Sequence, residues 1–350
     1  LFIAETGGQN AMIVDATALL EQVTLDILRS SFNSAGQRCS ALRILYVQED
    51  IFDQLIEKLI GAMAELRLGD PSDLETDIGP VIDAVSLKKL HQHCDFLESK
   101  NVPAQLIFRC ELPDDLPSGH YFAPSLYEIP AQSILAAEVF GPILHVVRYS
   151  EIELATVIAA VNNSGYGLTL GIHSRIESTQ NYICARARVG NIYINRHQVG
   201  AVVGCQPFGG MGLSGTGPKA GGANYLPALV HWQGESITAP SFFNKLILQL
   251  PALSLPLEPN IDSSIVVTSA AARLEALENF VCQLKTDVQV LARDNRAAAL
   301  FIHHISDLQR QALVLLLEPT ELPALVGERN QLRYLARGHL LLICRDSLLL

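Results

Sequence analysis

The chain has 350 residues, of which 49% are hydrophobic and 17% are charged. This length supplies material for two or three domains with a sizeable core, and this balance excludes a disordered polymer. The formal net charge of −11 excludes nonspecific nucleic-acid binding by this portion, because phosphate affinity comes from clustered Lys and Arg. The most apolar stretch, residues 246–253, contains Pro251 and is too short to cross a bilayer.

Seven cysteines are spread along the chain without a Cys-x-x-Cys pair, and their odd number gives no disulfide framework. This usage favours a reducing cytoplasm, and a peripheral position of a parent protein at the inner membrane stays open. The start lacks a basic segment followed by a long apolar one, so no signal peptide is predicted. Because Leu1 opens the chain inside a strand-like run, we expect a fragment of a longer protein.

Apolar residues alternate between strand-like and helix-like spacing along the first two thirds of the chain. We predict strands at residues 1–5, 11–14, 43–48, 104–110, 143–149, 168–174 and 191–195. The predicted helices lie at residues 17–31, 51–63, 83–99, 152–161 and 180–188, with Asp15 and Asp50 capping the first two. This alternation predicts an α/β fold with a largely parallel sheet.

The composition shifts near Gly234, after which Pro, Ser and Leu dominate. We expect residues 234–263 to form a linker or crossover. Strand-like and helical patterns then resume at residues 264–269, 270–285, 288–292, 307–317 and 340–344. We therefore predict a first domain at residues 1–233 and the opening of a second α/β domain at residues 264–350.

One cysteine stands in a loop of small residues, Phe32 to Ser40, between a predicted helix and a predicted strand. Gly36 and its small neighbours let the backbone approach a ligand closely. Arg38 is adjacent to Cys39 and would favour its thiolate, which is the nucleophilic form. The alternative is that Cys39 is a small buried hydrophobe, as free cysteines commonly are.

Three further segments carry residues suited to chemistry. Glu5 precedes Gly7 and Gly8, where a carboxylate serves either as a general base or as a structural cap or salt-bridge partner. Glu138 opens the run Glu-Val-Phe-Gly-Pro, where it either accepts hydrogen bonds from hydroxyl groups or belongs to an ordinary turn. Phe208 belongs to a Pro-Phe-Gly-Gly loop.

Histidine spacing predicts no metal site. His91 and His93 are two apart on a predicted helix and point away from each other, so they cannot share a metal. The pair His303 and His304 is predicted to lie at the surface or at a helix end.

In their order along residues 1–232, these four segments resemble the motifs of the aldehyde dehydrogenase superfamily. The resemblance implies that family's catalytic domain, with a Rossmann-like parallel sheet, and an NAD cofactor. It implies that Cys39 attacks the aldehyde to form a thiohemiacetal and then a thioester, with Glu5 as the base that activates water. Glu138 would hold the nicotinamide ribose, Phe140 would pack near the nicotinamide, and Gly7 would contribute to the cofactor site.

Residues 214–222 are similar to the L-glutamate γ-semialdehyde (1-pyrroline-5-carboxylate) dehydrogenase branch, in particular to the dehydrogenase half of bifunctional proline-catabolic enzymes. In that branch a Ser-Gly pair binds the amino-acid end of the substrate, and backbone amides suit a carboxylate. The resemblance implies substrate contacts from Arg38, Ser40, Ser214, Gly215 and Phe208.

The resemblance also implies partners. A parent polypeptide would carry a proline dehydrogenase domain, and FAD would belong to that part and not to this chain. The extension beyond residue 233 resembles a non-catalytic, aldehyde-dehydrogenase-like C-terminal domain, and a homo-oligomer is expected. Because the adenine, pyrophosphate and oxyanion contacts of the family lie upstream of Leu1, we expect the isolated chain to be inactive.

Three functions stay open. The first is NAD-dependent oxidation of glutamate semialdehyde, favoured because the candidate nucleophile, base and ribose carboxylate are all present. The second is an NAD(P)-dependent dehydrogenase for another aldehyde, such as succinate semialdehyde, which the loop at residues 214–215 and the long extension disfavour. The third is a non-catalytic oligomerisation or scaffold module, which predicts the loss of Glu5 or Cys39, and both are retained.

Overall fold

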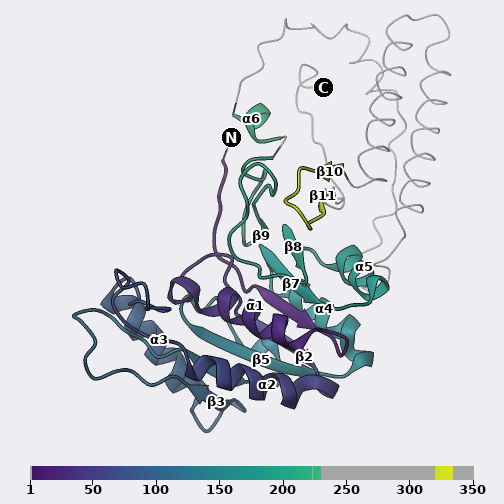
Figure 1. The fold of residues 1–350 in the computed structure, drawn as a ribbon. Helices are drawn as coiled ribbons and strands as arrows, with labels where there is room; N and C mark the ends of the chain where they lie inside the picture. The colour runs from purple at the N-terminus through teal and green to yellow at the C-terminus, as the bar shows by residue number, and fades with distance from the viewer. Residues whose placement is uncertain (1, 223, 230–319, 334–350) are drawn as a thin grey trace, which may run out of the picture. The chain divides into compact units, whose positions relative to one another are not determined.

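A seven-stranded sheet dominates residues 1–230 of the computed structural model, which describes residues 2–222, 224–229 and 320–333 (Figure 1). The strand order is β3-β4-β5-β2-β1-β7-β8. Every neighbouring pair is parallel except β3 with β4. The predicted α/β fold with a largely parallel sheet is therefore confirmed.

The strands of this sheet are short, and six of them coincide with predicted strands to within two residues at either end. They are β1 (Ala11–Val14), β2 (Ile44–Gln48), β3 (Gln105–Arg109), β4 (Ser125–Glu128), β5 (Ile143–Tyr149), β7 (Thr169–His173) and β8 (Asn191–Ile194). A separate antiparallel pair is formed by β6 (Tyr166–Gly167) and β9 (Met211–Gly212).

All five predicted helices are present with shifted ends. They are α1 (Leu20–Phe32), α2 (Glu49–Ala64), α3 (Ala84–Leu97), α4 (Leu154–Asn163) and α5 (Glu177–Arg186), and four short helical turns accompany them: η1 (Asn33–Gly36), η2 (Gln132–Ile134), η3 (Glu151–Glu153) and α6 (Tyr225–Ala228). α1 begins later than predicted because Asp15 caps the preceding turn, where its Oδ1 accepts from the backbone N of Thr17 at 2.8 Å. The helices α1 and α2 lie side by side against β2 and β5 (Figure 1).

The centre of the sheet is buried on both faces. Every residue of β1 and β2 is buried, which explains why both strands are continuous apolar runs without polar alternation. α2 covers the sheet with the face that carries Phe52, Leu55, Leu59 and Met63. A charged residue interrupts this core at the entrance of β2, where Arg43 is 1% exposed.

The predicted strand at residues 1–5 is wrong, and one strand of the seven-stranded sheet, β4, was not predicted. Phe2 is 78% exposed, and Glu5 forms only an isolated antiparallel bridge with Gly215. The apolar run therefore pairs with a loop and not with the sheet. β4 escapes prediction because it is four residues long and lies between Pro124 and Pro130, which are turn signals.

Parallel pairing collects distant segments at one edge. Because β1, β2, β5, β7 and β8 share one direction, the segments that enter them meet at the amino edge of the sheet. These segments are residues 8–10, 36–43, 138–142, 168 and 189–190. The motifs around Cys39 and Glu138 therefore share this edge although about a hundred residues separate them.

Residues 231–350 form a second unit in which residues 320–333 are described. There, β10 (Thr320–Leu322) and β11 (Asn330–Leu332) pair antiparallel. The predicted linker at residues 234–263 and the elements predicted at 264–317 and 340–344 lie outside the described residues, so the domain boundaries stay predictions. In the described part of the chain, no helix has the length and apolar character needed to cross a membrane.

Candidate active site

The backbone before Cys39 takes a conformation that few sequences allow. Ser34, Ala35 and Gly36 have φ values of 56°, 52° and 64°, in the left-handed region that favours glycine. A Cβ at Gly36 would lie 2.4 Å from the carbonyl oxygen of Gly141. The close approach predicted for Gly36 is therefore made to the loop that follows Glu138.

The Cys39 side chain is exposed, as a nucleophile requires. The pKa of its thiol is nevertheless raised, first by the protein packed around it and then by the negative charges of Glu138 and Glu5. Hydrogen bonds from the backbone N–H groups of Ser40 and Cys39 itself act in the opposite direction. At rest, the thiol of Cys39 therefore holds its proton more firmly than an ordinary cysteine.

Asn10 ties the entrances of three strands together. Its Nδ2 donates to the carbonyl oxygens of Cys39 at 2.6 Å and of Ala41 at 2.9 Å, and its Oδ1 accepts from the backbone N of Thr169 at 3.1 Å. The loop of Cys39 is thus held to β1 and β7 by a single buried amide. Asn10 lies outside the predicted site residues, although it follows the Glu-Thr-Gly-Gly-Gln run directly.

Glu5 is held by the loop that contains Ser214 and Gly215. The backbone N of Thr6 donates to the Ser214 carbonyl oxygen at 3.1 Å, and the backbone N of Thr216 donates to the Ala4 carbonyl oxygen at 3.1 Å. The Glu5 carboxylate accepts from the backbone N of Gly210 at 3.3 Å. Its pKa is raised by burial, and this hydrogen bond and the charge of Lys219 counteract the shift.

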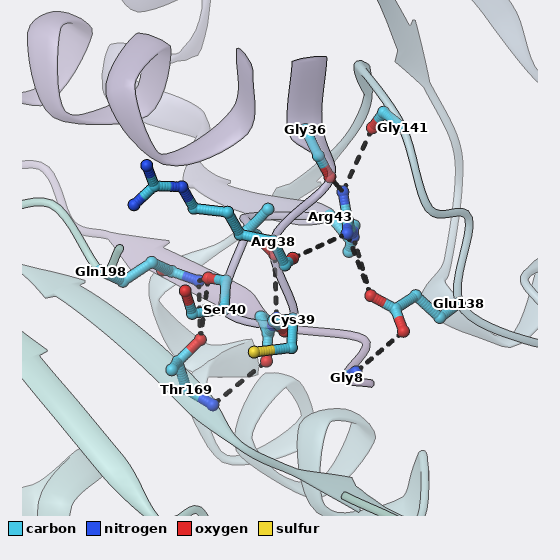
Figure 2. A network of polar contacts seen from close by, with 12 residues as sticks. Gly8, Gly36, Arg38, Cys39, Ser40, Arg43, Glu138, Gly141, Thr169 and Gln198 are labelled. Carbon is cyan, nitrogen blue, oxygen red and sulfur yellow. Dashed lines mark hydrogen bonds and ion pairs between the residues drawn. The ribbon is translucent and has the colours of Figure 1, made fainter. Parts of the chain in front are cut away.

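Glu138 and Arg43 form the central ion pair of the site (Figure 2). Nη2 of Arg43 lies 3.0 Å from Oε1 of Glu138, and Nε donates to the same oxygen at 3.3 Å. The other carboxylate oxygen, Oε2, accepts from the backbone N of Gly8 at 3.0 Å. Burial raises the pKa of Glu138, and Arg43 and the Gly8 hydrogen bond lower it.

Gly7 lies directly beneath this carboxylate. A Cβ at Gly7 would be 1.7 Å from Oε2 of Glu138, so no other residue fits there while Glu138 keeps its position. The two glycines therefore do more than form a turn, because Gly7 leaves room for the Glu138 carboxylate and Gly8 donates a hydrogen bond to it. The spacing of the motif alone does not reveal this contact. Phe140, two residues further on, is 43% exposed, and its ring centroid lies 5.2 Å from the guanidinium carbon of Arg43.

The residues that flank Cys39 point in different directions. Arg38 donates from Nε to Oγ of Ser34 at 3.0 Å, and its guanidinium points away from the Cys39 sulfur (Figure 2). Ser40 is buried, and its carbonyl oxygen accepts from Oγ1 of Thr169 at 3.2 Å and from Nε2 of Gln198 at 3.4 Å. In this conformation the thiolate-favouring contact expected from Arg38 is absent.

The remaining candidates belong to the loop after β8. Ser214 is buried, and its Oγ accepts from the backbone N of Gly167 at 3.0 Å. Gly215 forms the bridge to Glu5 described above. Phe208 is half-buried and pairs through its backbone with Ala220. The structure thus gives the hydroxyl of Ser214 a role in the turn and leaves Gly215 beside Glu5.

The site therefore combines an exposed thiol with two carboxylates whose charges act on it. Arg43, Asn10 and Lys219 join it from outside the predicted set. No group of three or more His, Cys, Asp and Glu residues able to hold a metal occurs among the residues that the structure describes.

The family model "Aldehyde dehydrogenase family" matches residues 2–233, and the chain belongs to that family. The chain is 43% identical over 348 residues to the bifunctional protein PutA of Salmonella typhimurium, covering 99% of this chain and 24% of that protein. The chain therefore spans only 18% to 24% of the length of the first PutA relatives.

Two solved structures extend the comparison. A crystal structure of bifunctional proline utilization A (PutA) is similar with a TM-score of 0.61 and 55% identity, covering 64% of this chain and 22% of that one. A 1-pyrroline-5-carboxylate dehydrogenase from Thermus with bound NAD is similar with a TM-score of 0.58 and 33% identity, covering 64% of this chain and 42% of that one.

Proposed function

We propose that this chain, within its full-length parent, catalyses the NAD-dependent oxidation of L-glutamate γ-semialdehyde to L-glutamate. The observation that carries the proposal is the meeting of an exposed Cys39 with Glu5 and Glu138 at one edge of the sheet, close enough for both charges to raise the pKa of the thiol. The names of the similar proteins, PutA and 1-pyrroline-5-carboxylate dehydrogenase, support the choice of substrate.

Cys39 would act as the nucleophile. Its sulfur forms a bond to the aldehyde carbon, and the thiol proton passes to the carbonyl oxygen to give a thiohemiacetal. Loss of a hydride from that carbon and of the proton from its hydroxyl oxygen leaves a thioester on Cys39. Water then adds to the thioester carbonyl, the carbon–sulfur bond breaks, and the acid is released with the thiol restored.

Glu5 would serve as the base. Burial raises the pKa of its carboxyl group, which makes the carboxylate a better proton acceptor near neutral pH. We assign one proton transfer to it, the removal of a proton from the water that attacks the thioester. Its attachment to the loop at residues 214–216 holds the base beside the segment expected to contact the substrate.

The residues present fit a nicotinamide cofactor. When bound, NAD would supply the hydride acceptor. Glu138 keeps 13% of its side chain exposed, and its Oε2 retains acceptor capacity for a sugar hydroxyl beside the Gly8 hydrogen bond. The exposed ring of Phe140 offers an apolar face next to it. We assign ribose contact to Glu138, nicotinamide packing to Phe140 and close approach to Gly7.

The amino-acid end of the substrate is assigned to the loop of Ser214 and Gly215, with Phe208, Arg38 and Ser40 as further contacts. Because the Ser214 hydroxyl is engaged in its own turn, the backbone of this loop is the better candidate for the carboxylate. In the same proposal, the parent carries a proline dehydrogenase domain with FAD and assembles as a homo-oligomer.

The test compares aldehydes in the full-length parent by following NADH formation. Glutamate semialdehyde should be strongly preferred to propionaldehyde and succinate semialdehyde, and Cys39→Ala should abolish turnover. Cys205→Ala, a half-buried cysteine in a loop, is the matched control and should keep it. A preference for the simpler aldehydes would refute the substrate assignment, and turnover by Cys39→Ala would refute the nucleophile.

A further inference from the structure

Among the described residues, Arg43 is one of the largest fully buried side chains, and it has no part in the proposed catalytic steps. Its guanidinium reaches four acceptors in two segments, residues 36–38 and 138–141 (Figure 2). Nη1 donates to the carbonyl oxygens of Gly36 at 2.6 Å and Gly141 at 3.1 Å, and Nη2 donates to the Arg38 carbonyl oxygen at 3.1 Å. The fourth acceptor is the Glu138 carboxylate.

A buried guanidinium is stable only where its charge and its N–H groups are satisfied. Glu138 supplies the compensating charge, and the three carbonyl oxygens occupy the remaining directions of the planar fork. The backbone of Arg43 is fixed as well, because its N donates to the Asn10 carbonyl oxygen at 2.9 Å and its carbonyl oxygen lies 2.9 Å from Nδ1 of His145.

The contacts of Glu138 leave one direction open. An ionised carboxylate has about four acceptor positions, two on each oxygen. Arg43 uses Oε1 twice, through Nε and Nη2, and Gly8 uses Oε2 once. The remaining position is on Oε2, the oxygen that lies over Gly7. The orientation that Arg43 imposes therefore decides which oxygen of Glu138 is available to a ligand.

We propose that Arg43 is a positioning residue that fixes the Glu138 carboxylate so that Oε2 accepts a hydroxyl of the cofactor sugar. This inference rests on the proposed function, in which Glu138 contacts the ribose. Arg43 acts on the cofactor through Glu138. A lysine cannot replace it, because one ammonium group cannot span the carboxylate and three carbonyl oxygens that the guanidinium reaches.

The test measures NADH affinity of the full-length parent by fluorescence titration, together with KM for NAD and kcat. Glu138→Gln should weaken NADH binding by about tenfold or more, the loss expected for a charge-assisted hydrogen bond. Arg43→Lys should weaken it to a similar extent. The double variant Arg43→Lys/Glu138→Gln should bind no more weakly than Glu138→Gln alone, because the two residues form one unit. Arg148→Lys, an exposed arginine on β5, is the matched control and should bind like the unaltered protein.

A second variant displaces the carboxylate without changing Arg43. Gly7→Ala places a Cβ 1.7 Å from Oε2 of Glu138 and should weaken NADH binding about as much as Arg43→Lys does. Gly61→Ala, where no atom lies within 4 Å of the added Cβ, should leave binding unchanged. If Arg43→Lys does not fold, Gly7→Ala tests the inference by itself. Unaltered NADH affinity in Gly7→Ala then overturns the inference.

The outcomes separate the inference from the function on which it rests. Unchanged NADH affinity in Glu138→Gln overturns the ribose contact and the positioning role with it. Weak binding by Glu138→Gln with normal binding by Arg43→Lys overturns the positioning role alone. Additive losses in the double variant also overturn it, because Arg43 would then act independently of Glu138.

Discussion

Asn10 donates from Nδ2 to the carbonyl oxygen of Cys39 at 2.6 Å, so the candidate nucleophile is held in place through its own backbone. The same amide also binds Ala41 and Thr169. The entrances of three strands are therefore held by one buried side chain. Gly8 must be a glycine, because a Cβ there would lie 2.4 Å from Oδ1 of Asn10.

Asn10→Ala should destabilise the fold and misplace Cys39. The substitution leaves three buried backbone groups without their partner, each worth on the order of 1 to 3 kcal/mol. The melting temperature should therefore fall, and the rate of Cys39 alkylation should change. Asn163→Ala, at the exposed end of α4, is the control. Equal melting temperatures for the two variants would contradict this role.

The charge of Glu5 should suppress the reactivity of the Cys39 thiol at rest. Because a nearby carboxylate raises the pKa of a thiol, Glu5→Gln should lower the pKa of Cys39 and speed its alkylation by iodoacetamide at neutral pH. The measurement is the pH dependence of the alkylation rate in the absence of substrate. A shift of the profile to higher pH would show that the coupling has the opposite sign.

The charge of Lys219 should lower the pKa of the proposed base, Glu5. Burial lowers its pKa to about 8, its Nζ donates to the Gly190 carbonyl oxygen, and its positive charge lowers the pKa of Glu5. Lys219→Met should therefore raise the pKa of Glu5 and move the acidic limb of p-nitrophenyl ester hydrolysis to higher pH. The control is Lys89→Met, an exposed lysine on α3. An unshifted limb in Lys219→Met would remove Lys219 from the site.

A pair of histidines should make the fold sensitive to acid. His93 and His145 face each other with their Nε2 atoms 2.9 Å apart, and burial lowers their pKa values to about 4 and about 3. Unfolded histidine has a pKa of about 6.5, so the unfolded chain takes up protons first as pH falls below that value. Stability is therefore lost from about pH 6.5 down to about pH 3, by up to about 1.4 kcal/mol per pH unit for each ring.

His93→Gln keeps a donor for His145 and removes one of these titrations. It should flatten the fall of the melting temperature between pH 7 and pH 5, measured on the parent protein, whereas the exposed His91→Gln should not. An equally steep fall in both variants would show that another group titrates there.

The alternating pattern was sufficient to predict the parallel sheet and its five main helices. Buried central strands such as β1 and β2 are continuous apolar runs, and these stand out from single residues. Pattern alone failed at residues 1–5, because an apolar run does not reveal whether a sheet neighbour exists for it. It also missed β4, a short strand enclosed by Pro124 and Pro130, which are turn signals.

The sequence was sufficient to predict the site residues that belong to motifs, but not the residues that hold those side chains in position. Cys39, Glu5 and Glu138 occur in recognisable runs, but Arg43 is merely the first residue of a predicted strand. Nothing local indicates that its side chain turns inward to Glu138, 95 residues away. Arg38 shows the converse, because adjacency to Cys39 suggested a contact that its bond to Ser34 does not provide.

The most direct test of the account is to trap the acyl group on Cys39. The full-length parent carrying Glu5→Gln is mixed with glutamate semialdehyde and NAD, and its peptides are analysed by mass spectrometry. Because the base that hydrolyses the thioester is missing, a glutamyl adduct should accumulate on the peptide that contains Cys39, and Cys39→Ala should show none. NADH formation without any adduct on Cys39, or an adduct on another cysteine, would contradict the account.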